Sequence, residues 1–242
     1  MQSVERTSTL RALADRLDAL QSDHRSGTPR LEPVSTDWAP IARQTSHEWF
    51  AAVPPLVLLA DIVSRSDDTS AGAVYWIGRA CWAYPSALQT VSEHSASLLN
   101  RSVFVDVPKR DREARVWTID VALRNPATVA VIADARGIDT SQSRRLQLAA
   151  EASQGVSLLW RSDDELGSLS VSHYRWQVQP ERTKAPHPRW RIDCLRCKDA
   201  AVLNQGWHTR TFIVEQRDGQ GALAVAADVV DRSRQTRQAH TA

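Results

Sequence analysis

Short apolar segments rich in β-branched residues alternate with segments of helical period through the middle of this chain, and this alternation restricts the fold more than any other feature. Residues 128–133 are small or β-branched, and residues 155–160 form a second apolar segment. Runs without polar alternation are typical of strands buried on both faces of a parallel sheet. The segment between them carries Leu146, Leu148 and Ala149 at helical spacing. Repeated units of this kind predict an α/β fold with right-handed crossovers and a doubly wound sheet.

The alternation extends toward the N-terminus and stops after Arg161. Further strands are expected at residues 47–50, 73–77 and 102–107, and further helices at residues 55–66 and 110–123. Beyond Arg161 the predicted strands have polar interruptions and no crossover helix between them; they cover residues 174–178, 189–196 and 211–215. We therefore expect a mostly parallel sheet that is extended at one edge by antiparallel strands.

Composition divides the chain into three parts. Residues 1–45 are predicted to be an N-terminal amphipathic helix followed by a flexible arm, because apolar residues recur at helical spacing before a segment rich in Ser, Thr and Pro. Residues 46–220 form the predicted core domain, and residues 221–242 a tail that is partly disordered. The apolar stripe of the helix is a candidate partner contact, made of Leu10, Leu13, Leu17 and Leu20.

Hydrophobic residues make up 42% of the 242 residues, which is ample for a continuous core. The longest apolar run, residues 53–60, is much shorter than the roughly 20 residues that span a bilayer. The first residues lack the pattern of a secretory signal, and three cysteines are too few for a disulfide framework. We therefore expect a cytoplasmic protein without a membrane segment.

Three segments resemble the ImuA family, which consists of RecA-related proteins of bacterial translesion synthesis. They are Ser46-His47-Glu48-Trp49-Phe50 followed by Pro54-Pro55-Leu56, Trp76-Ile77-Gly78 followed by Tyr84-Pro85, and the run Arg144-Arg145-Leu146-Gln147-Leu148-Ala149-Ala150-Glu151-Ala152. The resemblance spans residues 46–220. It implies a RecA-like core and a non-catalytic role in DNA-damage-induced mutagenesis, without a cofactor. The partners it implies are ImuB, a catalytically inactive Y-family polymerase homologue, the error-prone C-family polymerase, and RecA.

The phosphate-binding loop of a RecA-type ATPase is degenerate in this chain. Such a loop needs glycines, a lysine and a hydroxyl, so that backbone N–H groups and the ammonium hold the phosphates. After the first strand the chain instead reads Ala51, Ala52, Val53, Pro54, Pro55. The prolines remove N–H donors, so the sequence predicts that no triphosphate binds here.

Asp134 ends an apolar strand and is the candidate remnant of the second nucleotide motif, where a carboxylate reaches a magnesium-bound water. Without a phosphate loop the residue has no evident metal to hold. The alternative interpretation is that Asp134 turns the chain at the end of the strand.

Basic residues gather between residues 174 and 198 with aromatic residues among them, a pattern that can hold phosphates and stack bases. The alternative is a solvated sheet edge whose charges oppose aggregation. The candidate nucleic-acid contacts are Arg175, Trp176, Arg182, Lys184, Arg189, Arg191, Arg196 and Lys198.

Two further features of the sequence bear on possible binding sites. Trp82 follows a strand end in a polar segment, so it is a candidate exposed anchor for a partner protein. Cys194 and Cys197 have the spacing of a metal or redox pair, but residues three apart on a strand point to opposite faces. No metal site is therefore expected.

Four functions follow from these patterns. The preferred one is a non-catalytic adaptor in SOS-induced translesion DNA synthesis that binds an inactive Y-family polymerase homologue, RecA or both, with any DNA contact indirect. The alternatives are a SulA-like cell-division inhibitor, a DNA-binding RecA-like module, and an ATPase with an unrecognised phosphate loop.

Overall fold

The computed structural model describes residues 34–35, 40–41, 43–65, 72–85, 88, 95–184, 187–198, 211–216 and 223–229. The chain divides into two units, Met1–Glu32 and Pro33–Ala242, and every described residue belongs to the second. The predicted N-terminal helix with its leucine stripe lies outside the described residues, as does the end of the predicted tail.

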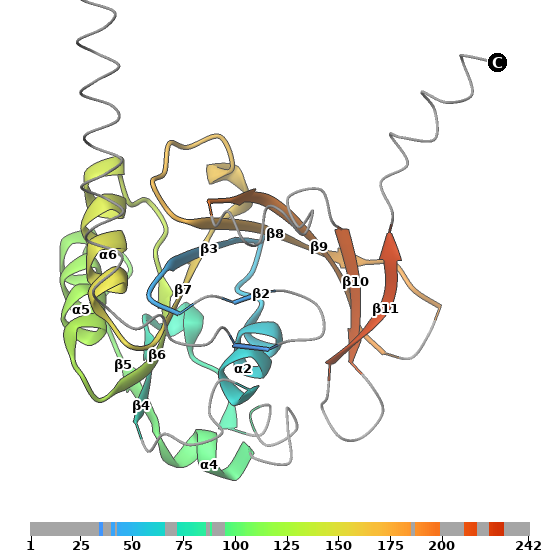
Figure 1. The fold of residues 1–242 in the computed structure, drawn as a ribbon, viewed down its shortest axis with the longest axis horizontal. Coiled ribbons are helices and arrows are strands. Elements are labelled where there is room, and N and C mark those ends of the chain that lie inside the picture. Colours follow the sequence, from blue (N-terminus) through green and yellow to red (C-terminus); the bar gives the residue numbers. More distant parts are fainter. Residues whose placement is uncertain are drawn as a thin grey trace, which may run out of the picture. The chain divides into compact units, whose positions relative to one another are not determined.

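One sheet of nine strands forms the centre of the second unit, in the order β11-β10-β9-β8-β3-β7-β6-β4-β5 (Figure 1). Pairing is parallel from β5 across to β8 and antiparallel from β8 to β11. The α/β class, the mostly parallel sheet and the antiparallel edge strands are thus confirmed, and the arrangement is compatible with a RecA-like fold. The strands are β3 (Ser46–Phe50), β4 (Ala73–Ile77), β5 (Ser102–Val105), β6 (Thr128–Asp134), β7 (Val156–Arg161), β8 (Tyr174–Glu181), β9 (Arg189–Cys197), β10 (Thr211–Gln216) and β11 (Leu223–Val229).

Two regions contain strands for which composition predicted none. β1 (Val34–Ser35) and β2 (Pro40–Ile41) pair in a small antiparallel sheet within the predicted arm. β11 lies within the predicted tail and forms one edge of the large sheet. Pairing with β10 along the whole strand adds β11 to the core domain.

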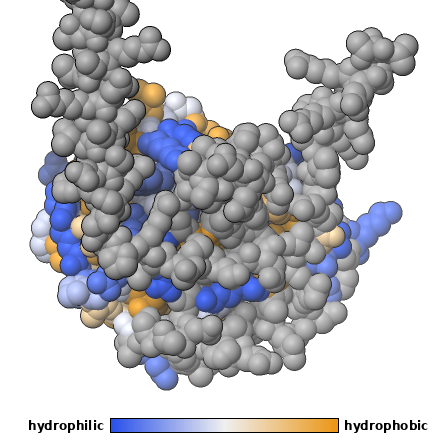
Figure 2. All heavy atoms as spheres, in the orientation of Figure 1, coloured by the Kyte–Doolittle hydropathy of each residue, from blue (hydrophilic) through white to orange (hydrophobic). Residues whose placement is uncertain are grey.

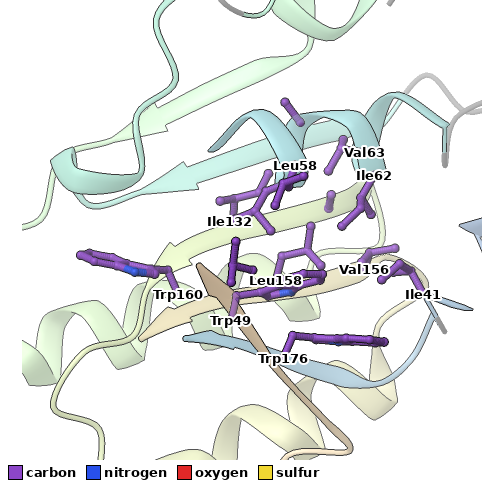
Figure 3. Packing of buried hydrophobic residues seen from close by; sticks show 14 of the residues in the cluster. Ile41, Trp49, Leu58, Ile62, Val63, Ile132, Val156, Leu158, Trp160 and Trp176 are labelled. Atoms are coloured by element: carbon purple, nitrogen blue, oxygen red, sulfur yellow. The ribbon is translucent and has the colours of Figure 1, made fainter. Parts of the chain in front are cut away.

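Helices cover both faces of the parallel part of the sheet. They are α2 (Leu56–Arg65), α4 (Ser95–Asn100), α5 (Arg112–Arg124) and α6 (Thr140–Ala152), with 3-10 turns at η1 (Arg79–Cys81) and η2 (Asp163–Glu165). Alternate residues of β6 enter two separate clusters: Ile132 packs with the α2 side and Val131 with the α5 and α6 side. Figure 3 shows the α2 cluster, in which Trp49 and Trp176 lie among aliphatic residues of the helix and the sheet.

Two aspartates define where the helices after β5 and β6 begin. The Asp111 carboxylate accepts a hydrogen bond from the Ala114 N–H at 2.9 Å, and the Asp139 carboxylate accepts one from the Gln142 N–H at 2.9 Å. The Gln142 side chain in turn accepts from the Asp139 N–H, which completes a capping box. These caps hold the loops that precede α5 and α6 at the carboxyl end of the sheet.

A β-bulge in β9 changes the expected position of the cysteines. Arg196 pairs with Arg175 and Cys194 pairs with Trp176, so Leu195 is the extra residue. The bulge returns Cys194 and Cys197 to the same face, where both are buried in the α2 cluster. The expectation that they point to opposite faces was therefore wrong. Burial, and then the neighbouring Cys197, raises the pKa of Cys194 to about 12, so this thiol stays protonated near neutral pH.

Gly155, between α6 and β7, is a sharp test of this packing. A Cβ atom there would lie 2.4 Å from the Val129 carbonyl oxygen, and that backbone belongs to the buried strand β6. We expect Gly155→Ala to lower the free energy of unfolding by about 1–3 kcal/mol in denaturant titrations, as overpacking does. The matched control is Gly167→Ala, because a Cβ at Gly167 meets nothing within 4 Å. Equal effects of the two changes would contradict this close approach of the chain to β6.

Candidate functional site

The turn between β3 and α2 is the place where the sequence predicts a degenerate phosphate-binding loop. It consists of Ala51 to Pro55, and β3 lies among the parallel strands of the sheet. The Ala51 N–H donates to the Arg161 carbonyl oxygen at 3.1 Å, and the Trp160 indole N–H donates to the Ala51 carbonyl oxygen at 3.0 Å. Both backbone groups of Ala51 therefore bond to β7 and cannot serve a ligand.

An acidic residue lies beside the same turn. Asp163, in η2, is near enough to the Ala52 backbone N–H for that group to act on its pKa. Burial raises the pKa of Asp163, the Ala52 N–H opposes this, and the neighbouring charge of Asp164 raises it further. A phosphate in this turn would compete with a carboxylate for the Ala52 donor and would be repelled by both acids.

The Asp134 carboxylate forms an ion pair with Arg136, two positions later in the chain. Arg136 donates to both carboxylate oxygens, at 2.9 Å from Nε and 2.6 Å from Nη2, and its backbone N–H donates at 3.1 Å. The Arg136 guanidinium also stacks on Trp160, 4.2 Å from the ring centroid. Burial opposes ionisation of Asp134, but the bonds from Arg136 outweigh it and lower the pKa. The carboxylate therefore turns and ties the chain at the strand end.

An ion-pair network centred on the fully buried Glu48 and Arg161 lies behind these loops. Glu48 of β3 is 0% exposed and lies 3.3 Å from Arg161 Nη1 of β7 and 3.5 Å from Arg175 Nε of β8. Arg161 is 1% exposed, and its Nη2 lies 2.6 Å from Glu165. The Ser170 hydroxyl donates to Glu48 at 2.8 Å. The network joins the three central strands and holds the η2 segment against their ends.

The basic segment between residues 174 and 198 does not form one nucleic-acid surface. Trp176 is 0% exposed, so it is a core residue and not a platform for stacking bases. Arg175 packs over Phe50 in the buried network. Four other cations bond within the chain: Arg189 to Glu215, Arg191 to Asp193, Arg196 to the carbonyl oxygens of Ser170 and Ser172, and Lys198 to that of Val171.

Arg182 and Lys184, between β8 and β9, are exposed. Trp82 is half-buried: its indole N–H donates to the Val105 carbonyl oxygen at 3.3 Å, and its ring packs edge-on against Phe104. Among the tryptophans that the structure describes, Trp117 of α5 is exposed, at 59%. Figure 2 shows hydrophilic and apolar residues interspersed over the face in view.

Sequence reasoning missed a cationic rim at the carboxyl ends of β4, β5 and β6. Two adjoining cavities of about 400 and 500 Å³ lie there, and Arg136 lines both. The rim is contributed by η1, the β5–α5 loop and the β6–α6 loop; its cations are Arg79, Lys109, Arg110, Arg112, Arg115 and Arg136. The dense run Lys109-Arg110-Asp111-Arg112-Glu113-Ala114-Arg115 was the signal that could have revealed it.

In the described part of the chain, no group of three or more His, Cys, Asp or Glu residues is arranged to hold a metal ion. The helices of the same residues include none long and apolar enough to cross a membrane.

The chain is similar to the protein named ImuA in two strains of Caulobacter vibrioides. Identity is 26% over 160 residues with each, which covers 60% of this chain and 63% of the length of each relative. No family model matches the chain. The similarity confirms the resemblance to ImuA inferred from residues 46–220.

The buried network predicts a large cost for removing its central charge. Glu48→Gln leaves Arg161 with Glu165 alone and Arg175 beside a neutral amide, so we expect the free energy of unfolding to fall by about 3 kcal/mol. The matched control is Asp106→Asn, which breaks the exposed pair with Arg79 at 2.7 Å and should cost under about 1 kcal/mol. Denaturant titrations of both variants measure the difference, and comparable losses would show that the Glu48 contacts are not those described.

The Asp134 pair predicts a pH dependence. Because the folded-state pKa of Asp134 lies below its ordinary value of 3.8, its ionisation stabilises the fold at pH values above 3.8. That contribution is lost as the pH falls through the folded-state pKa. We therefore expect Asp134→Asn to be less stable than the wild type at pH 6, with the gap narrowing below pH 3.8. Thermal unfolding from pH 7 to pH 2.5 measures this, and a constant gap would argue against the pair.

Proposed function

We propose that this chain is a non-catalytic, RecA-like adaptor in SOS-induced translesion DNA synthesis. Its similarity to ImuA supports the role in mutagenic DNA repair. The proposal that the chain is not a catalyst rests on one observation: the chain's own groups fill the place where a nucleotide would bind. The backbone of Ala51 bonds to β7, the Asp163 carboxylate lies near the Ala52 N–H, and the Asp134 carboxylate is paired with Arg136. An adaptor built on this fold works through its surfaces and needs no cofactor.

The partners that we propose are an ImuB-like inactive Y-family polymerase homologue, RecA and the error-prone C-family polymerase. The proposed contact for a protein partner is the leucine stripe of residues 10–20, because an amphipathic helix ahead of an arm is suited to a hydrophobic groove. Trp82 is a secondary candidate at its edge-on position against Phe104. The proposed compartment is the cytoplasm, where these partners act.

Binding of ATP distinguishes the two hypotheses, because an ATPase must bind ATP and the proposed adaptor does not. We expect the full-length protein to show no saturable binding of a fluorescent ATP analogue with Mg²⁺, and Asp134→Ala to behave identically. Saturable binding by the wild type that Asp134→Ala abolishes would establish the ATPase alternative and overturn the proposal. RecA in the same titration serves as the positive control.

Partner capture tests the adaptor role directly. The immobilised full-length protein should retain the purified inactive polymerase homologue of the same organism equally with ATP, with ADP and with neither. Leu13→Asp with Leu17→Asp should weaken this capture at least tenfold, because two charges then interrupt the apolar stripe. The control Arg11→Asp changes the net charge by the same two units on the opposite side of the predicted helix, and it should retain capture. Undiminished capture by the double variant would remove the N-terminal helix from the interface.

A further inference from the structure

The cationic rim forms a shallow, positively charged surface at the carboxyl edge of the parallel sheet, the edge at which α/β sheets usually bind ligands. Both rim aspartates nearest the strands are already neutralised: Asp106 pairs with Arg79 at 2.7 Å and Asp134 with Arg136 at 2.6 Å. Lys109 and Arg110 extend from the same rim and are exposed. Asp111 and Glu113 also line the larger cavity, so the six cations of the rim face four carboxylates and the rim keeps a net positive charge.

Arg115 provides an independent indication of an anionic ligand. It lines the larger cavity and is only 5% exposed. Its two Nη atoms donate to the carbonyl oxygens of Lys109 and Arg136, which joins the β5–α5 loop to the β6–α6 loop, while its Nε has no hydrogen-bond partner among the described residues. None of the ion pairs found in the described structure includes Arg115. The Asp134 carboxylate acts on Arg115 electrostatically, but the buried Nε lacks an acceptor, and an anion on the rim would add a second counter-charge.

The first turn of α5 adds to the same field. The helix begins after Asp111, whose carboxylate caps the Ala114 N–H, and the positive end of its dipole points toward the rim. Arg112 donates from Nη1 to the Gly137 carbonyl oxygen at 2.9 Å, so its guanidinium is held across the cavity mouth. Fixed guanidinium groups match the geometry of phosphate oxygens.

We propose that this rim binds successive phosphate groups of a single-stranded DNA backbone. Cations distributed along three loops suit a polymer with a repeated charge better than a single anion. An acidic peptide would also bring apolar side chains, for which the rim offers only small surfaces such as Ala80 and Val107. This binding site adds to the adaptor role and does not depend on it.

Charge reversal at two exposed positions tests the proposal on the full-length protein. Lys109→Glu with Arg110→Glu removes two cations whose side chains hold no other part of the described structure. The matched control is Arg182→Glu with Lys184→Glu, which makes the same change between β8 and β9, where the sequence pattern favours nucleic-acid contact. Fluorescence anisotropy with a labelled strand of about 30 nucleotides should show at least tenfold weaker binding for the rim variant and less than a twofold change for the control. In the rim variant, the slope of log K against log salt concentration should become shallower by about 1.4, because each lost phosphate contact contributes about 0.7.

The other outcomes each overturn the proposal. Absent or salt-independent DNA binding by the wild type removes phosphate contact altogether. Loss in the control with retention in the rim variant transfers the site to the β8–β9 turn. Binding of free ATP or inorganic phosphate at the rim, without binding of the strand, identifies a small-anion site instead. In every case partner capture by the rim variant is measured in parallel, so a failed DNA site is distinguished from a failed adaptor.

Discussion

A buried carboxylate on the central strand is the constraint on which the rest of the domain depends. Glu48 has no contact with water, so β3 requires cations from both neighbouring strands. Arg161 supplies one from β7 and Arg175 supplies the other from β8. Because Arg161 also binds Glu165, the same network holds η2 at the end of the sheet.

The position of η2 has a direct chemical consequence. It places Asp163 against the Ala52 N–H, in the turn where a nucleotide-binding relative would hold a phosphate. At the end of β6, Arg136 forms an ion pair with the Asp134 carboxylate and stacks on Trp160. At β3 the carboxyl edge of the sheet is therefore occupied by the chain's own groups, while the segments after β4, β5 and β6 leave a cationic surface open.

Expectations from the sequence succeeded where a residue's role depends on its close neighbours along the chain. The apolar run that became β6, the helical period of α6 and the proline-containing turn after β3 are all local patterns. Expectations failed where the role depends on distant partners. Trp176 was predicted to contact nucleic acid, yet it stacks on Trp49 in the core. Cys194 and Cys197 were assigned to opposite faces because a bulge opposite Trp176 leaves no mark in spacing.

Contiguous residues were enough to establish the α/β class and the order of the central strands, because periodicity can be read along the chain. Which charges are free to meet a ligand depended on the folded arrangement alone. Arg189, Arg191 and Arg196 are bonded within the sheet edge, whereas Lys109 and Arg110 extend from a rim assembled by three separate loops. A cation that already has a counter-charge within the chain gains less from a ligand than one that has none, and packing decides which cations are paired.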